Sequence, residues 1–137
     1  MLEKYVENFS ADEFIKSFME EKQVGKAEAT SLIRKGIPKE SFYQTKVKEG
    51  LKKAFPDAFV VKVSLGNYAE AGIPDLLCIW QGHYFGFEIK RPIFGEASPL
   101  QAAIMKKIRA AGGTAEIVSW PEEAIKIMED YKNGKKA

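Results

Sequence analysis

Apolar residues recur at helical spacing near the start of the chain. They are Phe14, Ile15, Phe18 and Met19. Ahead of them, Ser10 and Glu13 have the spacing of a capping box, in which the Ser hydroxyl and the Glu carboxylate each accept a free backbone N–H at a helix start. A second short helix is expected over residues 26–35, because Gly36 follows it as a helix end. Residues 1–38 are therefore predicted to form a helical N-terminal extension.

From residue 38 onward, helical and strand-like patterns alternate. Helices are expected over residues 38–54, 98–111 and 121–131, and strands over residues 58–63, 75–80, 83–90 and 114–118. Gln81 and Gly82 are predicted to form a two-residue turn that joins the second and third strands into a hairpin. The order α-β-β-β-α-β-α predicts an α/β fold of the α+β kind, with helices packed against a small mixed sheet.

Length and composition limit the chemistry that the chain can perform. The 137 residues carry a formal charge of +2 and 45% hydrophobic residues, which suits one globular domain with a single core. We expect this domain over residues 39–131, with residues 132–137 as a basic tail. Cys78 is the only cysteine and His83 the only histidine, which excludes a disulfide framework, a Cys-rich zinc site and a Ser-His-Asp triad. Any catalysis must therefore rest on carboxylates and lysines.

Charge is unevenly distributed along the chain. Residues 1–33 hold four lysines and seven acidic residues, whereas residues 34–62 hold eight basic and three acidic residues. A basic segment in a nearly neutral protein is typical of a phosphate-backbone binder, although a solvated helix face would have the same composition. The candidate nucleic-acid-binding residues are Lys46, Lys48, Lys52, Lys53 and Lys62, together with Asn67 and Tyr68 in the loop after the first strand. For that loop, an ordinary polar connection remains an equal alternative.

Two acidic residues and a lysine stand where the hairpin can bring them together. Asp75 lies six residues before Gln81, and Glu88 lies six residues after Gly82. Alternation along the third strand directs Glu88 and Lys90 to one face and the apolar residues Phe85, Phe87 and Ile89 to the other. Two crowded carboxylates repel each other unless a cation lies between them, and Mg²⁺ prefers such oxygen ligands. Each residue also has a structural alternative, because Asp75 can cap a turn and the other two can form an exposed strand face.

Four motifs follow one another in this part of the chain. They are Gly72-Ile73-Pro74-Asp75, the hairpin, Glu88-Ile89-Lys90 and Ser98-Pro99-Leu100-Gln101. This order resembles the PD-(D/E)XK nuclease superfamily, and its G-I-P-D, E-I-K and S-x-x-Q forms resemble the VRR-NUC family, small nucleases related to Holliday-junction resolvases. The resemblance covers about residues 39–128. It implies a restriction-endonuclease-like core that hydrolyses phosphodiester bonds with Mg²⁺ or Mn²⁺.

The resemblance also implies a role for particular residues. The implied site consists of Asp75 and Glu88 as metal ligands, the backbone carbonyl of Ile89 as a further ligand, Lys90 as the catalytic lysine and Gln101 as a glutamine that lines the site. Such nucleases carry another acid on the helix before the first strand. Glu40 is the candidate, because it stands seven residues before Val47 and shares its helix face. Gln101 is also explained by a capping box with Ser98, and Glu40 by the preference of acids for helix N-termini.

The expected function is that of a metal-dependent endonuclease acting on DNA, with junctions or flaps as candidate substrates. Resolvase-like nucleases imply a homodimer, and residues 1–38 offer a surface for a protein partner. The alternative from a different class is a catalytically silent nuclease-fold module that binds nucleic acid or a protein partner. Such a binder has no need to keep Asp75, Glu88 and Lys90 together. A helix-turn-helix over residues 10–35 is a weaker third option, because its net acidic charge suits a protein interface better than a DNA groove.

The sequence carries no sign of a membrane segment. No apolar run approaches the roughly 18 residues that span a bilayer, and the N-terminus is polar and acidic rather than a signal peptide. We therefore expect no membrane association and a cytoplasmic location. A small stand-alone nuclease would suit a prokaryotic or phage-infected cell.

Overall fold

The computed structural model describes residues 11–63, 71–93 and 95–134. Within these ranges, tertiary contacts divide the chain into two compact units. One unit comprises the part up to Lys39 together with Arg91–Gly95, and the other comprises Glu40–Lys90 and the part from Glu96 onward. None of the described helices is both long and apolar enough to cross a lipid bilayer.

The first unit contains two helices, α2 (Ala11–Lys22) and α3 (Lys26–Gly36). Both were predicted from the sequence, α2 from the spacing of its apolar residues and α3 from Gly36 as a helix end. Its small core is built from Phe14, Ile33 and Ile37, with Ile15, Phe18 and Ile93 packed against them. The predicted capping box cannot be compared with the structure, because Ser10 lies outside the described residues.

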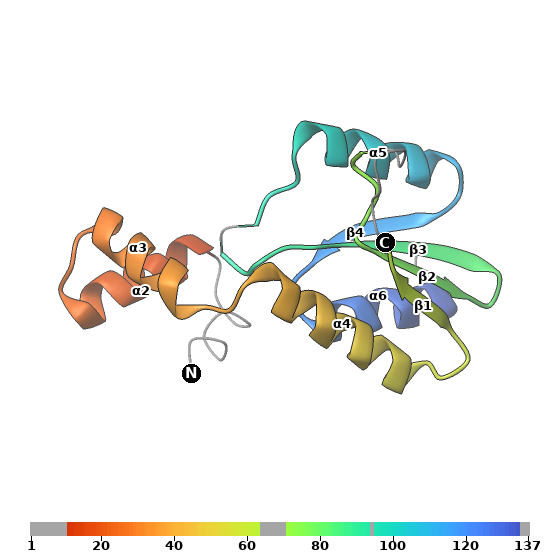
Figure 1. The fold of residues 1–137 in the computed structure, drawn as a ribbon, viewed down its shortest axis with the longest axis horizontal. Coiled ribbons are helices and arrows are strands. Elements are labelled where there is room, and N and C mark those ends of the chain that lie inside the picture. The colour runs from red at the N-terminus through yellow and green to blue at the C-terminus, as the bar shows by residue number, and fades with distance from the viewer. Residues whose placement is uncertain (1–10, 64–70, 94, 135–137) are drawn as a thin grey trace. The chain divides into compact units, whose positions relative to one another are not determined.

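The second unit is an α/β domain with one mixed sheet, as the sequence predicted (Figure 1). Its elements are α4 (Glu40–Ala54), β1 (Phe59–Lys62), β2 (Leu76–Trp80), β3 (His83–Ile89), α5 (Pro99–Ala110), β4 (Thr114–Val118) and α6 (Pro121–Lys132). The strand order is β1-β2-β3-β4. Strand β2 runs antiparallel to both β1 and β3, and β4 runs parallel to β3.

Helix α4 begins two residues later than the sequence predicted, at Glu40 instead of residue 38. Ile37 has extended backbone angles, with φ at −100° and ψ at 150°. A residue before proline is pushed out of the helical region, because the proline ring crowds its backbone. Pro38 therefore separates α3 from α4 and does not occupy the first turn of α4.

The β2–β3 hairpin sets the register of the sheet next to the site. Its turn, Gln81–Gly82, has positive φ at both residues, 50° and 79°, which is the type I′ geometry that suits the twist of a hairpin. Leu76 pairs with Phe87 in the resulting ladder. Continuing this register by one residue sets Asp75 opposite Glu88. The hairpin predicted from the sequence is confirmed.

The sheet has a different helix layer on each face. Helices α4 and α6 cover one face, and α5 lies on the other (Figure 1). The core lies mainly on the α4–α6 side and includes Tyr43, Val47, Leu51, Phe55, Val60, Leu76, Cys78, Trp80, Phe85, Phe87, Ile89, Val118, Ala124 and Met128. Close packing of α4 on α6 depends on Gly50, because a Cβ added there would lie 2.6 Å from Cβ of Pro121.

Candidate active site

Three carboxylates from separate elements meet at one end of the sheet. Glu40 is the first residue of α4, Asp75 directly precedes β2, and Glu88 lies near the end of β3. One carboxylate oxygen from each lies within 4.8 Å of the others. Among the described residues, no other group of three acidic, histidine or cysteine side chains meets this condition. The structure thus brings together the three acids that the sequence analysis selected.

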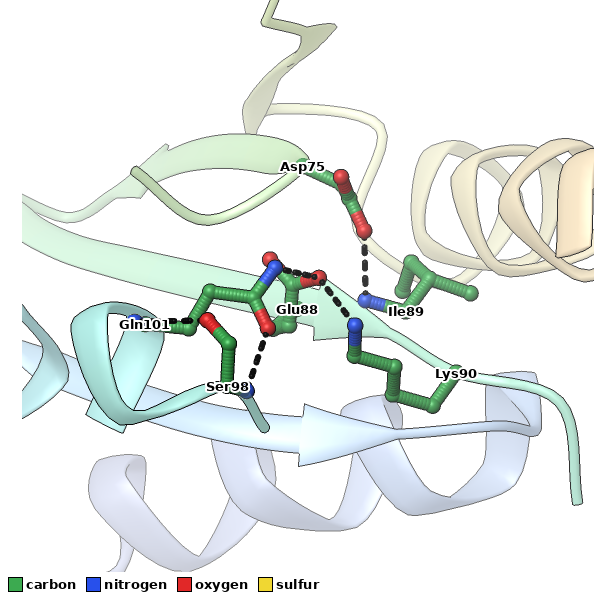
Figure 2. A network of polar contacts seen from close by, with 6 residues as sticks. All are labelled: Asp75, Glu88, Ile89, Lys90, Ser98 and Gln101. Carbon is green, nitrogen blue, oxygen red and sulfur yellow. Dashed lines mark hydrogen bonds and ion pairs between the residues drawn. The ribbon is translucent and has the colours of Figure 1, made fainter. Parts of the chain in front are cut away.

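Glu88 is the most buried member of this acidic cluster, with only 2% of its side chain exposed. Its Oε2 accepts a hydrogen bond from Gln101 Nε2 at 3.0 Å and lies 3.3 Å from Lys90 Nζ (Figure 2). Its other oxygen, Oε1, is buried and has no hydrogen-bond partner. Burial, reinforced by the negative charge of Asp75, raises the pKa of Glu88 to about 7, while Lys90 acts in the opposite direction.

Asp75 is held by the backbone of the neighbouring strand. Its Oδ2 accepts a hydrogen bond from the backbone N–H of Ile89 at 2.8 Å (Figure 2). The hairpin register explains this contact, because Asp75 faces the end of β3. The resemblance implied the carbonyl of Ile89 as a ligand, whereas the contact with Asp75 uses its N–H. The role of the carbonyl stays a prediction.

Gln101 reaches the cluster from the first turn of α5 and also takes part in the capping of that helix. Its backbone N–H donates to Ser98 Oγ at 3.1 Å, and its side-chain Oε1 accepts the backbone N–H of Ser98 at 2.9 Å. Because Oε1 is occupied by Ser98, the amide NH₂ is the group turned toward Glu88 (Figure 2). The two explanations offered for Gln101 from the sequence, cap and site residue, are therefore compatible.

Lys90 follows directly after β3, and its backbone N–H donates to the carbonyl of Val118 in β4 at 3.1 Å. Its side chain is 17% exposed and paired with Glu88. The alternative that these two residues form an exposed strand face is wrong. The sheet face that carries Glu88 is covered by α5, and the sequence does not reveal which face of a sheet a later helix will cover.

The predicted nucleic-acid-binding lysines fall into two groups. Three of them border a groove of about 270 Å³ between α4 and β1. The groove is lined by Lys48, Lys52 and Lys62 together with Ser41, Gln44, Thr45, Glu49 and Leu76. Lys46 and Lys53 do not line it, and Nζ of Lys46 lies 5.6 Å from the ring centroid of Phe42. Asn67 and Tyr68 lie outside the described residues.

Ser98, Ser41 and Thr45 were not among the site residues predicted from the sequence. The S-x-x-Q pattern was visible and predicted the cap, but the consequence for the Gln101 amide depends on where α5 lies over β3. Ser41 and Thr45 are four residues apart and so share a helix face. That spacing was available in the sequence, whereas the strand that they face was not.

Comparison with known proteins adds to this geometry at the level of structure. No protein-family model matches the sequence, and no curated protein matches it. A solved structure described as "VRR_NUC domain" superposes with a TM-score of 0.57 at 26% sequence identity, covering 69% of this chain and 99% of that chain. A second, described as "VRR_NUC domain protein", has a TM-score of 0.58 at 18% identity and covers 73% of this chain and 93% of that chain.

These similarities define the class of the protein as a mixed α/β domain with a nuclease-type fold. Within that class, the chain is similar to VRR-NUC domains, the family that the order of its motifs resembles. A fold of this type implies a nucleic acid as substrate.

Proposed function

We propose that the protein is a metal-dependent endonuclease that hydrolyses phosphodiester bonds in DNA. The observation that supports this most strongly is the acidic cluster of Glu40, Asp75 and Glu88, with Lys90 beside it. Nothing in the packing of a stable domain requires three carboxylates to lie this close together, and crowded like charges are destabilising. The arrangement suits a cation and a phosphate.

The donor atoms of the cluster fit a hard divalent cation such as Mg²⁺ or Mn²⁺. Such ions prefer carboxylate and carbonyl oxygens. Glu88 Oε1 is buried without a partner, and a buried polar atom in that state costs free energy unless something binds it. Asp75 and Glu88 would hold the ion, with Glu40 and the carbonyl of Ile89 as further ligands. When bound, the ion lowers the pKa of a bound water and offsets negative charge on the reacting phosphate.

Each neighbouring residue then has a defined task. Lys90 directs a positive charge into the site, where it stabilises the charge that develops on the phosphate oxygens or orients the attacking water. Gln101 holds Glu88 through Oε2, which leaves the buried Oε1 without a hydrogen-bond partner. Glu40, the third carboxylate of the cluster, would bind the ion directly or hold a water or a second ion beside it.

The proposal also assigns roles to the domain, to its two flanking segments and to the assembly. The nuclease domain comprises residues 39–131, followed by the basic tail of residues 132–137. Residues 1–38 form an extension that binds a protein partner. A homodimer, as in the resolvase-like nucleases that the chain resembles, would allow two sites to cut two strands. Junctions and flaps are the DNA structures to which such paired sites are suited.

The decisive experiment incubates the protein with labelled linear, flap and four-way DNA in Mg²⁺, Mn²⁺ or EDTA. We expect cleavage with either ion and none in EDTA. Asp75→Asn and Glu88→Gln should abolish both cleavage and the calorimetric signal of Mn²⁺ binding. Glu129→Gln, which alters an exposed carboxylate on α6, is the matched control and should retain both. DNA binding without cleavage of any substrate by the parent protein would favour the catalytically silent module instead.

A further inference from the structure

The lysines of α4 lie on two different flanks of the helix. Each helical residue advances about 100° around the axis, so Lys46 lies about 200° from Lys48. Lys48 and Lys52 turn toward β1 and line the groove described above. Lys46 and Lys53 lie on the flank that also carries Gly50, which packs against α6. The helix thus presents two pairs of lysines of equal charge in different surroundings.

The groove follows a continuous row of side chains that starts at the acidic cluster. Glu40, Gln44, Lys48 and Lys52 are spaced four residues apart. The buried residues Tyr43, Val47 and Leu51 have the same spacing. Rows of equal spacing run parallel along a helix. The first row therefore follows the margin of the buried stripe from Glu40 to Lys52, next to β1.

The opposite wall of the groove also leads to the cluster. This wall contains Lys62 at the end of β1 and Leu76 at the start of β2. These two residues are register partners, and Leu76 directly follows Asp75. Glu40 likewise directly precedes Ser41, which lines the groove on the α4 side. Each wall therefore ends next to a carboxylate of the cluster, so a chain lying in the groove would enter the site directly.

The lining of the groove suits a sugar-phosphate backbone. Among the residues that the structure describes, the lining has three lysines against one acid, Glu49, and hydroxyl and amide donors from Ser41, Thr45 and Gln44. This described lining contains no aromatic side chain on which a base could stack. Proteins that hold single bases use aromatic platforms, whereas lysines and hydroxyls contact phosphates without reading sequence.

We propose that the α4–β1 groove holds consecutive backbone phosphates of the strand being cut, on one side of the scissile phosphate. The inference rests on the proposed nuclease function and adds a substrate requirement to it. From Glu40 to Lys52, α4 advances about 18 Å. One strand of a duplex advances about five nucleotides over that length. The substrate therefore needs about five nucleotides on that side, and their sequence is not read.

The test compares the two lysine pairs by DNA binding in EDTA, where no metal-dependent cleavage occurs. Lys48→Ala/Lys52→Ala and Lys46→Ala/Lys53→Ala each remove two positive charges from α4. Fluorescence anisotropy with a labelled 20-base-pair duplex, repeated over a range of salt, gives the slope of log affinity against log salt. We expect the groove pair to reduce this slope by about 1.8, since each phosphate contact contributes about 0.9. The control pair should leave the slope unchanged.

Two further variants sharpen this measurement. Glu49→Gln removes the one acid among the described residues that line the groove and should raise affinity, an effect opposite in sign to that of the lysine changes. Lys48→Gln/Lys52→Gln retains much of the aliphatic stem that a lysine packs against its neighbours. It keeps the test valid if the alanine pair destabilises the fold. Circular dichroism during heating checks folding of each variant.

Length dependence is the second measurement. Single strands of two to ten nucleotides should bind more tightly with each added nucleotide up to about five, and then level off. This dependence should be lost in the groove pair and retained in the control pair. A steady increase with no levelling, or equal behaviour of the two pairs, would overturn the groove as the binding track and indicate diffuse attraction.

The outcomes separate this inference from the proposed function. Cleavage by the parent protein with equal salt slopes for both pairs would overturn the groove alone. The groove pattern in a protein that cleaves no DNA would overturn the nuclease proposal and leave the groove as a backbone-binding site. Absence of any DNA binding by the parent protein would overturn the groove.

Discussion

The two faces of β3 are both buried, but they are built from different chemistry. One face carries Phe85, Phe87 and Ile89, which pack into the core beneath α4 and α6. The other carries Glu88, which is as fully removed from water yet keeps one oxygen without a partner. Burial stabilises the fold on the first face and opposes it on the second. Burial alone therefore does not distinguish a core from a site; the kind of side chain that is buried does.

The comparison predicts the largest loss of stability on the apolar face. Phe87→Ala should lower the free energy of unfolding by about 3–5 kcal/mol, because it removes a fully buried ring and leaves a cavity. Guanidinium denaturation measures this. Phe59→Ala, at a ring that is 58% exposed on β1, is the control and should cost far less. Equal losses at the two positions would contradict the assignment of β3's apolar face to the core.

The polar face should show its importance in activity instead of stability. Lys90→Ala should reduce cleavage about 10²–10³-fold, the effect typical of removing one positioned charge or donor from a reacting group. Binding of Mn²⁺ and of DNA should persist. Single-turnover cleavage and Mn²⁺ calorimetry measure the two properties, with Lys53→Ala as the surface control. A parent-like cleavage rate would make Lys90 an ordinary lysine.

The carboxyl of Glu88 should make stability depend on pH. Its pKa of about 7 in the folded chain lies above the ordinary value of 4.5, so between these values the folded state binds more protons than the unfolded state. Stability associated with this group is therefore present at low pH and lost as the pH rises through about 7. Without metal, Glu88→Gln should be more stable than the parent at pH 8, by up to about 3 kcal/mol.

Denaturation of the parent and Glu88→Gln in EDTA at pH 4.5 and pH 8 checks this expectation. The difference between the two proteins should nearly vanish at pH 4.5, where the parent carboxyl is protonated. Adding Mg²⁺ at pH 8 should stabilise the parent more than the variant, because a ligand stabilises only the state that binds it. A parent that is more stable than the variant at pH 8 in EDTA would show that Glu88 is well satisfied as a carboxylate.

Substitutions of Gln101, which serves both the cap of α5 and the site, should have the smallest effects on stability. Gln101→Ala should lower stability by about 1 kcal/mol through the loss of hydrogen bonds to Ser98 and Glu88. Gln101→Glu can still accept the backbone N–H of Ser98, as in an ordinary capping box, but it cannot donate to Glu88. At pH 5, where Glu88 is protonated and can donate to the new carboxylate, thermal unfolding of Gln101→Glu should recover toward the parent value. At pH 8 the two carboxylates repel each other, so neither stability nor cleavage should recover. Recovery of both would reduce Gln101 to a capping residue.

Local patterns made part of this site predictable. The positions of Asp75 and Glu88 are symmetric about Gln81–Gly82, so a two-residue turn was enough to set them opposite each other. Helix α5 was predictable from Ser98 and the residues after it, because a capping box is a local device.

Tertiary packing decides the features that could not be predicted. Lys46 and Lys48 are lysines of the same helix, and only the position of β1 decides which of them lines the groove. The burial of Glu88 depends on α5 covering that face of the sheet. Its Oε1 is left without a partner because Lys90 and Gln101 both contact Oε2. Sequence patterns specify faces and ends of elements, but not which neighbour will meet them.

The two-residue turn of the β2–β3 hairpin has a consequence for how this chain can change in length. An insertion of one residue between Asp75 and the turn, or between the turn and Glu88, would shift the two strands past each other by one position. Because neighbouring residues of a strand face opposite sides, such a shift would present an apolar side chain at the site and direct a carboxylate into the core. Insertions and deletions in this hairpin should therefore be more damaging than most substitutions, and related chains should differ in length elsewhere.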